Sequence, residues 1–313
     1  MASSLTAKVE RRDPLGNIAM MILKNVLSTA SPSDFKRSST MKTFPRYPRL
    51  AHAHSPRIRR IGIAVAALVA AAGTAFACSD SGPSEPPDLS GTFFGPVTVV
   101  ASGSGRAYVI LDASGAPTNL GVALTASAMA NLPNDAAEYV FALPSQAGST
   151  PFKHAAINWA PQGHPPPMIY TVPHFDFHFY TITQAAREAI LLGDSALAAK
   201  MARQPAGAYI PAGYVTGMSA AQMGMHWNDP TAPERHGEPF TATFIYGSYD
   251  GAFIFAEPMV TKAFLETKPA TLVVPVKLPA QYATTGYHPT SYTVSYDATT
   301  KEYRVALSGL IRR

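Results

Sequence analysis

The sequence predicts a mainly β domain, a β-rich α+β fold in which antiparallel strands form a sandwich or a barrel with two or three short helices. Short segments rich in β-branched and aromatic residues recur along residues 88–313, and they give roughly nine or ten strands. Asp250-Gly251 between two such segments is typical of a two-residue hairpin turn. Helical patterns are short and few, which favours the β-rich class.

Local patterns place these elements along the chain. The predicted strands span residues 96–101, 106–112, 139–143, 153–159, 168–182, 241–246, 252–256, 271–276, 291–296 and 303–307. The predicted helices span residues 125–132, with Thr125 as N-cap, 183–192 and 196–203. Prolines within residues 161–167 predict a rigid loop. Residues 205–239 are predicted to be mostly loop, which at this length is typical of a functional segment.

An export signal is predicted before this domain. Three arginines between residues 57 and 60 precede an apolar run over residues 61–77, which ends at Cys78. This order is typical of a signal peptide, and Ala75-Phe76-Ala77-Cys78 resembles a bacterial lipobox with Ala in place of the usual Leu. A membrane anchor is the alternative, but the run is shorter than the ~20 apolar residues that a spanning helix needs.

The chain therefore divides into segments with different expected roles. Residues 1–40 are interpreted as a misassigned start, residues 41–77 as the signal peptide, residues 78–87 as a disordered tether, and residues 88–313 as a single β-rich domain. The mature protein is expected in the cell envelope, periplasmic or at the cell surface, where a lipid on Cys78 holds it on a membrane.

The charge of the chain is divided unevenly between these segments. The whole chain has a net charge of +5, whereas residues 1–77 hold 12 Lys or Arg and 3 Asp or Glu, a net charge of +9, so residues 78–313 carry 5 − 9 = −4. The mature part has no basic patch of the kind that binds nucleic acid, so nucleic-acid partners are not expected. With one cysteine in the chain, an intrachain disulfide is impossible.

The most informative stretch is His174–Tyr180, in which polar and aromatic residues alternate. Side chains of a β-strand point to opposite faces with period two. One face is therefore predicted to carry Phe175, Phe177 and Phe179 toward a core. The other face carries two imidazoles, a carboxylate and a phenol, which is interpreted as the wall of a site.

Histidines gather around this stretch, and histidine with carboxylate is the usual ligand set for zinc, iron or manganese. On a strand, residues two apart are about 6.6 Å apart and residues four apart about 13 Å. His174 and His178 can therefore share one ion only if the strand bends, and Asp176 with either histidine is the less strained pair. The predicted metal ligands are drawn from His174, Asp176, His178, His226 and Glu257, with His164, Tyr180 and His236 as possible residues of the surrounding shell.

Other interpretations of the cluster remain open at this point. The histidines could form a structural polar network that packs a homo-oligomer interface in a non-catalytic envelope or stress protein, or a metal-free catalytic site. The sequence contains no nucleophile elbow, phosphate-binding glycine loop, His-Glu-x-x-His helix or cysteine pair. No reaction is therefore assigned, and if the protein is an enzyme we expect a metal-dependent one.

Several segments together resemble one uncharacterised bacterial family. They are Asn158–Pro166, His174–Tyr180, Met223–Trp227, Tyr249–Gly251 and Glu257–Met259. The family is typified by a hypothetical protein of Thermus that is controlled by sigma-E and its anti-sigma-E factor. The resemblance spans about Phe93 to Arg313, with Ala160 where Asn is expected, and it implies a β-rich exported domain that forms a ring-like homo-oligomer. A weaker analogy links the His-x-Asp-x-His strand to cupins, whose usual downstream Glu is missing.

Overall fold

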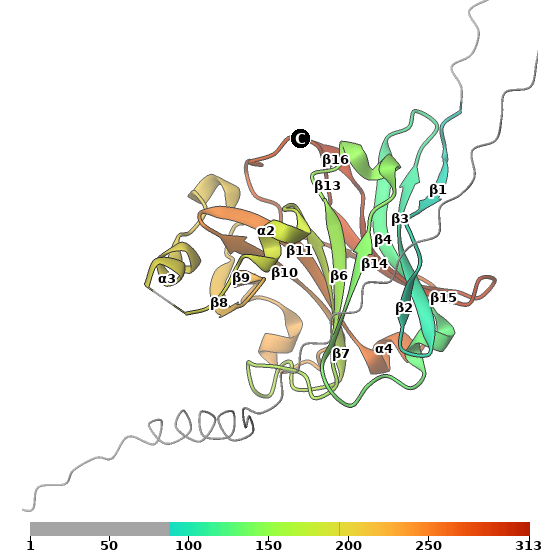
Figure 1. Cartoon of the computed structure of the whole chain (residues 1–313), viewed down its shortest axis with the longest axis horizontal. Coiled ribbons are helices and arrows are strands. Elements are labelled where there is room, and N and C mark those ends of the chain that lie inside the picture. Colours follow the sequence, from blue (N-terminus) through green and yellow to red (C-terminus); the bar gives the residue numbers. More distant parts are fainter. Residues whose placement is uncertain (1–87, 194) are drawn as a thin grey trace, which may run out of the picture. The chain divides into compact units, whose positions relative to one another are not determined.

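A computed structural model describes residues 88–193 and 195–313 (Figure 1). The predicted start segment, signal peptide, lipidated Cys78 and tether lie outside the described residues. Within the described ranges, no helix has both the length and the apolar composition that crossing a membrane requires.

The described residues form two antiparallel sheets of seven strands each and a small two-stranded sheet. The first sheet has the order β1-β3-β4-β15-β14-β12, with β2 paired to β3. Its strands are β1 Gly91–Phe94, β2 Thr98–Val100, β3 Gly103–Leu111, β4 Pro117–Thr125, β12 Leu272–Pro275, β14 Ser291–Asp297 and β15 Glu302–Ser308. The small sheet pairs β13 Tyr287–His288 with β16 Ile311–Arg312.

The second sheet has the order β5-β6-β7-β11-β10-β9-β8. Its strands are β5 Ala137–Ala142, β6 His154–Ala160, β7 His174–Tyr180, β8 Val215–Ala220, β9 Gly224–Asn228, β10 Ala242–Tyr249 and β11 Ala252–Thr261. β7 therefore lies inside the sheet, between β6 and β11.

Short helices connect the strands. The α-helices are α2 Gln184–Glu188, α3 Ser195–Ala202 and α4 Lys262–Glu266, and the 3₁₀ helices are η1 Ala126–Met129, η2 Ser145–Ser149, η3 Gly207–Tyr209 and η4 Pro233–His236. The side-chain oxygens of Thr183 and Thr261 accept hydrogen bonds from the first turns of α2 and α4, which fixes where these helices begin.

The two seven-stranded sheets pack face to face around one apolar core. Phe175, Phe177 and Phe179 of β7 meet Leu120 and Val122 of β4 in this core, and all five are at most 1% exposed. Each such side chain contributes about 1.5–3 kcal/mol of transfer free energy when it is buried. The predicted mainly β class is confirmed, and the arrangement is a sandwich rather than a closed barrel.

Two predicted elements differ from the structure in length. The predicted helix over residues 125–132 is only the 3₁₀ turn η1, because β4 continues to Thr125 and Asn131 has a positive φ of 53°. The predicted strand over residues 168–182 is shorter, because Met168 has a φ of 67° and the chain folds back before β7 begins at His174.

The segment predicted to be mostly loop, residues 205–239, contains two paired strands. β8 pairs with β9, and β9 pairs with β10, so this segment extends the second sheet. By contrast, the predicted hairpin turn at Asp250-Gly251 is present between β10 and β11, with positive φ at both residues.

Candidate metal centre

The outer face of β7 carries the polar residues that the alternation predicted. All seven residues of β7 are buried, so this face is covered as well as the core face. Neighbouring strands add to it, because cross-strand partners share a face. His178 lies opposite Ala156 of β6, and the β11 residue Glu257 follows Ala256, the partner of Phe179.

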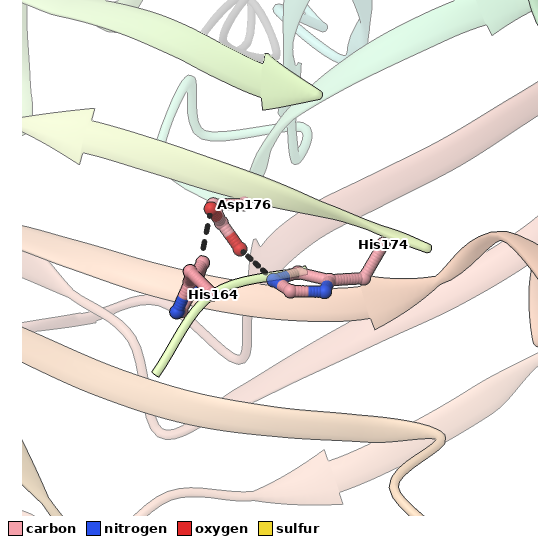
Figure 2. Close-up of side chains that lie close together, drawn as sticks. All are labelled: His164, His174 and Asp176. Carbon is pink, nitrogen blue, oxygen red and sulfur yellow. Dashed lines mark ion pairs between the residues drawn. The ribbon is translucent and has the colours of Figure 1, made fainter. Parts of the chain in front are cut away.

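The first group of potential ligands consists of His164, His174 and Asp176. Figure 2 shows the Asp176 carboxylate between the two imidazoles, with His174 Nε2 at 3.1 Å from Oδ1 and His164 Nε2 at 3.4 Å from Oδ2. His174 is fully buried, Asp176 is 5% exposed, and His164 is partly exposed at the rim.

The loop before β7 holds His164 beside His174. Its Gly163 has a φ of 65°, and a Cβ on this glycine would overlap the carbonyl oxygen of Tyr170. The same carbonyl accepts a hydrogen bond from the His164 amide at 3.1 Å. The loop thus folds against the residues that precede β7, and the His164 and His174 rings meet edge to face with centroids 4.6 Å apart.

The second group consists of His178, His226 and Glu257. His178 Nε2 lies 3.5 Å from Glu257 Oε2, and these residues are 1% and 2% exposed. In both groups the ligand atoms all lie within 4.8 Å of one another. His226 reaches the group from β9, where it pairs with Gly247 of β10.

The local geometry of β10 and β11 makes room for the second group. A Cβ at Gly247 would overlap the ring of Phe255, and this ring packs edge to face on His178 and His226. β11 pairs with β7 before Glu257 and again after Pro258, but these two residues have no pairing partner on β7. Because proline has no amide hydrogen, the ladder is weakened where Glu257 turns toward His178.

Three of the four histidines have their tautomer fixed by the backbone. Nδ1 of His164, His174 and His226 lies 2.7–2.8 Å from a carbonyl oxygen, that of Pro165, Val172 and Met218 respectively. A carbonyl oxygen only accepts, so Nδ1 must carry the hydrogen. Nε2 offers a lone pair to a metal whenever the ring is neutral, and next to Asp176 it can instead carry a second hydrogen that the carboxylate accepts. Burial lowers the pKa of His164, but the hydrogen bond to Asp176 and the charge of that residue outweigh it and the net shift is upward.

Several atoms of the two groups are buried without a hydrogen-bond partner. They are His174 Nε2, Asp176 Oδ1, both ring nitrogens of His178, and Glu257 Oε2. Leaving such groups unpaired costs about 1–3 kcal/mol each. A cation shared by these lone pairs would satisfy them, so the side chains fit a metal ion.

Burial and neighbouring charges shift the pKa values of the two groups in different directions. Burial raises the pKa of Asp176, but the facing imidazoles of His164 and His174 outweigh it and the net shift is downward. Burial lowers the pKa of His178 to about 3, so this ring is neutral. Burial, and then the charge of Asp176, raises the pKa of Glu257 well above its usual range. The carboxyl of the first group is therefore a stronger acid than usual, and that of the second group a weaker one.

One pocket serves both groups. Its volume is about 470 Å³, and its lining includes His164 and Asp176 of the first group together with His226 and Glu257 of the second. β8 contributes residues 215–220 to the wall, and Arg235 of η4 lies on it as well. A ligand in this pocket would therefore have access to both groups.

The predicted ligands fall into two groups rather than one. His174 and Asp176 lie in the first, and His178, His226 and Glu257 lie in the second. His164, predicted for the surrounding shell, is itself a member of the first group.

Two other residues predicted for the shell lie outside both groups. Tyr180 is buried beside His178, with stacked rings 5.5 Å apart. His236 is exposed, and its Nε2 contacts the Pro230 carbonyl at 2.9 Å.

Sequence reasoning missed a second polar cluster beside the site. His154 of β6 stacks on Tyr180 with centroids 4.8 Å apart, and the Arg187 guanidinium of α2 lies 4.9 Å from the centroid of the same ring. Arg187 is 1% exposed and pairs with Glu138 and with Gln222. His154 lies within the predicted strand over residues 153–159, but only its pairing with Tyr180 places it on the site face.

Comparison with known proteins gives one partial match. Residues 112–159 match the family model TTHB210-like, described as hypothetical protein TTHB210. The resemblance drawn from the sequence is confirmed over these residues, which run from the end of β3 to β6 and stop before β7. The analogy to cupins has no support, and the two open sheets differ from their closed barrel. Neither a curated protein nor a solved structure matches the chain.

Proposed function

We propose that the domain binds two divalent transition-metal ions, one in each group, as an exported, lipid-anchored protein of the cell envelope. The observation that carries this proposal is that two sets of two imidazoles and one carboxyl group have their ligand atoms within 4.8 Å of one another, while Nδ1 of His164, His174 and His226 is held by a backbone carbonyl and Nε2 stays available. The unpaired buried atoms of His178 and Glu257 support it. Two imidazoles and one carboxylate suit zinc, iron or manganese.

The number of protein ligands bears on what the ions could do. Each group offers three side chains, whereas structural zinc sites have four protein ligands. An ion held by three side chains keeps a coordination position for water or another ligand, and both groups border the same pocket. The proposal is therefore for ions that bind ligands from the pocket, rather than for ions that only stabilise the fold.

A structural role of the histidines at a homo-oligomer interface has less support. His174 and His178 are 0% and 1% exposed in a single chain, so the chain covers these imidazoles itself. Self-association through another surface is compatible with metal binding, and we keep a homo-oligomer as part of the proposal. Sedimentation of the purified protein with and without chelator tests whether assembly depends on the ions.

Elemental analysis of the purified full chain tests metal binding. We expect about two ions per chain in the parent protein and about one in His174→Ala or His178→Ala, since each variant damages one three-ligand group. The matched control is His236→Ala, which removes an exposed imidazole outside both groups. Protein without stoichiometric metal, or equal metal in all four proteins, would contradict the proposal.

A further inference from the structure

In the described part of the chain, Arg235 differs from four other arginines of the domain in having no carboxylate partner. Arg106, Arg187, Arg203 and Arg304 each form an ion pair with a carboxylate. Among the described residues, Arg235 forms no such pair, and its buried Nε has no hydrogen-bond partner. Its guanidinium lies 5.9 Å from the ring centroid of Tyr170, and it lines the pocket that the two metal groups share.

The charge of this pocket would be strongly positive with the proposed ions in place. Two divalent ions exceed the charge of Asp176 and Glu257 by two, and Arg235 adds a third positive charge. Imidazole ligands are neutral when they bind a metal and do not change this balance. A partly enclosed pocket with such an excess attracts anions.

The geometry of the charges favours one class of anion. A guanidinium presents a planar fork of donors that matches phosphate and carboxylate oxygens, and a divalent ion with an open coordination position binds a phosphoryl oxygen as a Lewis acid. The pocket of about 470 Å³ is in the range of sites for small organic molecules. Apolar side chains of Val215, Met218 and Ile245 share the wall and could contact an organic part of the ligand.

We propose that the metal-loaded pocket binds a phosphate-type oxyanion, with Arg235 and the two ions as its partners. The source of this chemistry is inorganic phosphate or the phosphoryl group of a small phosphate ester. This inference rests on the proposed metal binding, and bound metal and bound anion can be measured separately on the same protein.

The test is calorimetric titration of full-chain protein loaded with zinc and freed of excess metal. Inorganic phosphate and glycerol 1-phosphate are the probes, and metal content is measured on the same samples. We expect phosphate binding by the loaded protein and none by the metal-free protein. Arg235→Gln should keep two ions and bind both probes at least about tenfold more weakly, since a charge-assisted bidentate contact is lost.

Two further variants sharpen the result. Arg235→Lys keeps the charge but not the fork, and should lie between the parent protein and Arg235→Gln. Arg203→Gln removes an exposed guanidinium that is paired with Asp250 and should bind like the parent. Tighter binding of the ester identifies an organic phosphate, and equal binding identifies phosphate alone, both within the proposal.

The outcomes separate the two proposals. Protein that holds two ions but binds neither probe, or Arg235→Gln that keeps its metal and binds as tightly as the parent, overturns the oxyanion site and leaves the metal sites standing. Protein that cannot be loaded with two ions overturns both.

Discussion

His178 Nε2 lies 3.5 Å from Glu257 Oε2, and neither atom has a hydrogen-bond partner. Burial keeps the His178 ring neutral and, with the charge of Asp176, raises the pKa of the Glu257 carboxyl. A metal ion that entered this group below the raised pKa of Glu257 would displace a proton from the carboxyl rather than from the imidazole.

The first prediction concerns proton release when metal binds. At any pH below the raised pKa of Glu257, this carboxyl should release one proton per ion, so the metal affinity of the second group should rise with pH up to that pKa. Titrations of metal into metal-free protein, in buffers with different ionisation enthalpies, count the protons. Glu257→Gln should lower the count per chain by about one, whereas Glu238→Gln, an exposed control, should leave it unchanged. An unchanged count in Glu257→Gln would contradict the assignment.

The second prediction concerns the stability of the metal-free domain at acid pH. Burial, and then the charge of Arg187, lowers the pKa of His154 to about 4 from its usual 6.5. A lowered pKa in the folded state gives stability that is present above pH 6.5 and is lost as the pH falls toward 4. His154→Phe keeps a ring on Tyr180 and should lose less stability than the parent between about pH 7 and 5. Urea unfolding in EDTA at both pH values measures this, and parallel losses would argue against a buried neutral His154.

The third prediction concerns the packing around the second group. Gly247→Ala should destabilise the domain by about 1–3 kcal/mol, because the new Cβ overlaps the Phe255 ring. Displacement of this ring should also weaken the site, since it contacts His178 and His226. Gly148→Ala is the control, because a Cβ there meets nothing within 4 Å. Thermal melts with and without metal would show the difference, and equal melting temperatures of the two variants would refute it.

The fourth prediction concerns the segment before the domain. If Cys78 carries a lipid, Cys78→Ser should move the protein from the membrane fraction to the soluble fraction of the cell envelope. Fractionation followed by immunodetection measures this. Retention of Cys78→Ser in the membrane would favour a spanning segment over residues 61–77 instead.

The two faces of β7 could be predicted because strand alternation is a local property. The three phenylalanines of His174–Tyr180 occupy the core, and the polar residues occupy the outer face, as period two requires. Distances along a strand also indicated that His174 and His178 would not easily share one ion. In the structure these two histidines belong to different groups, and Asp176 lies with His174. These inferences need only the geometry of one strand.

Features that depend on contacts between segments far apart in the sequence could not be predicted in the same way. His164 reaches the first group only because Gly163 allows its loop to approach Tyr170. β4 is buried on both faces and contains Gly121, so its sequence lacks the alternation that marks a half-buried strand. β8 is mostly exposed and contains small polar residues, and it is a strand because it pairs with β9.

The placement of the ligands on separate segments has a consequence for the chain as a whole. His164 lies on a loop and His226 on β9, whereas the other ligands lie on β7 and β11. In the proposed metal-bound state, each ion would fasten one of these outlying segments to the centre of the second sheet. A protein with one cysteine cannot make an intrachain disulfide, and the two ions would close loops in its place. Because these ligands come together only in the folded chain, the binding free energy of the ions would add to the stability of the fold. A chelator should therefore destabilise this protein, as a reducing agent destabilises a disulfide-bonded one.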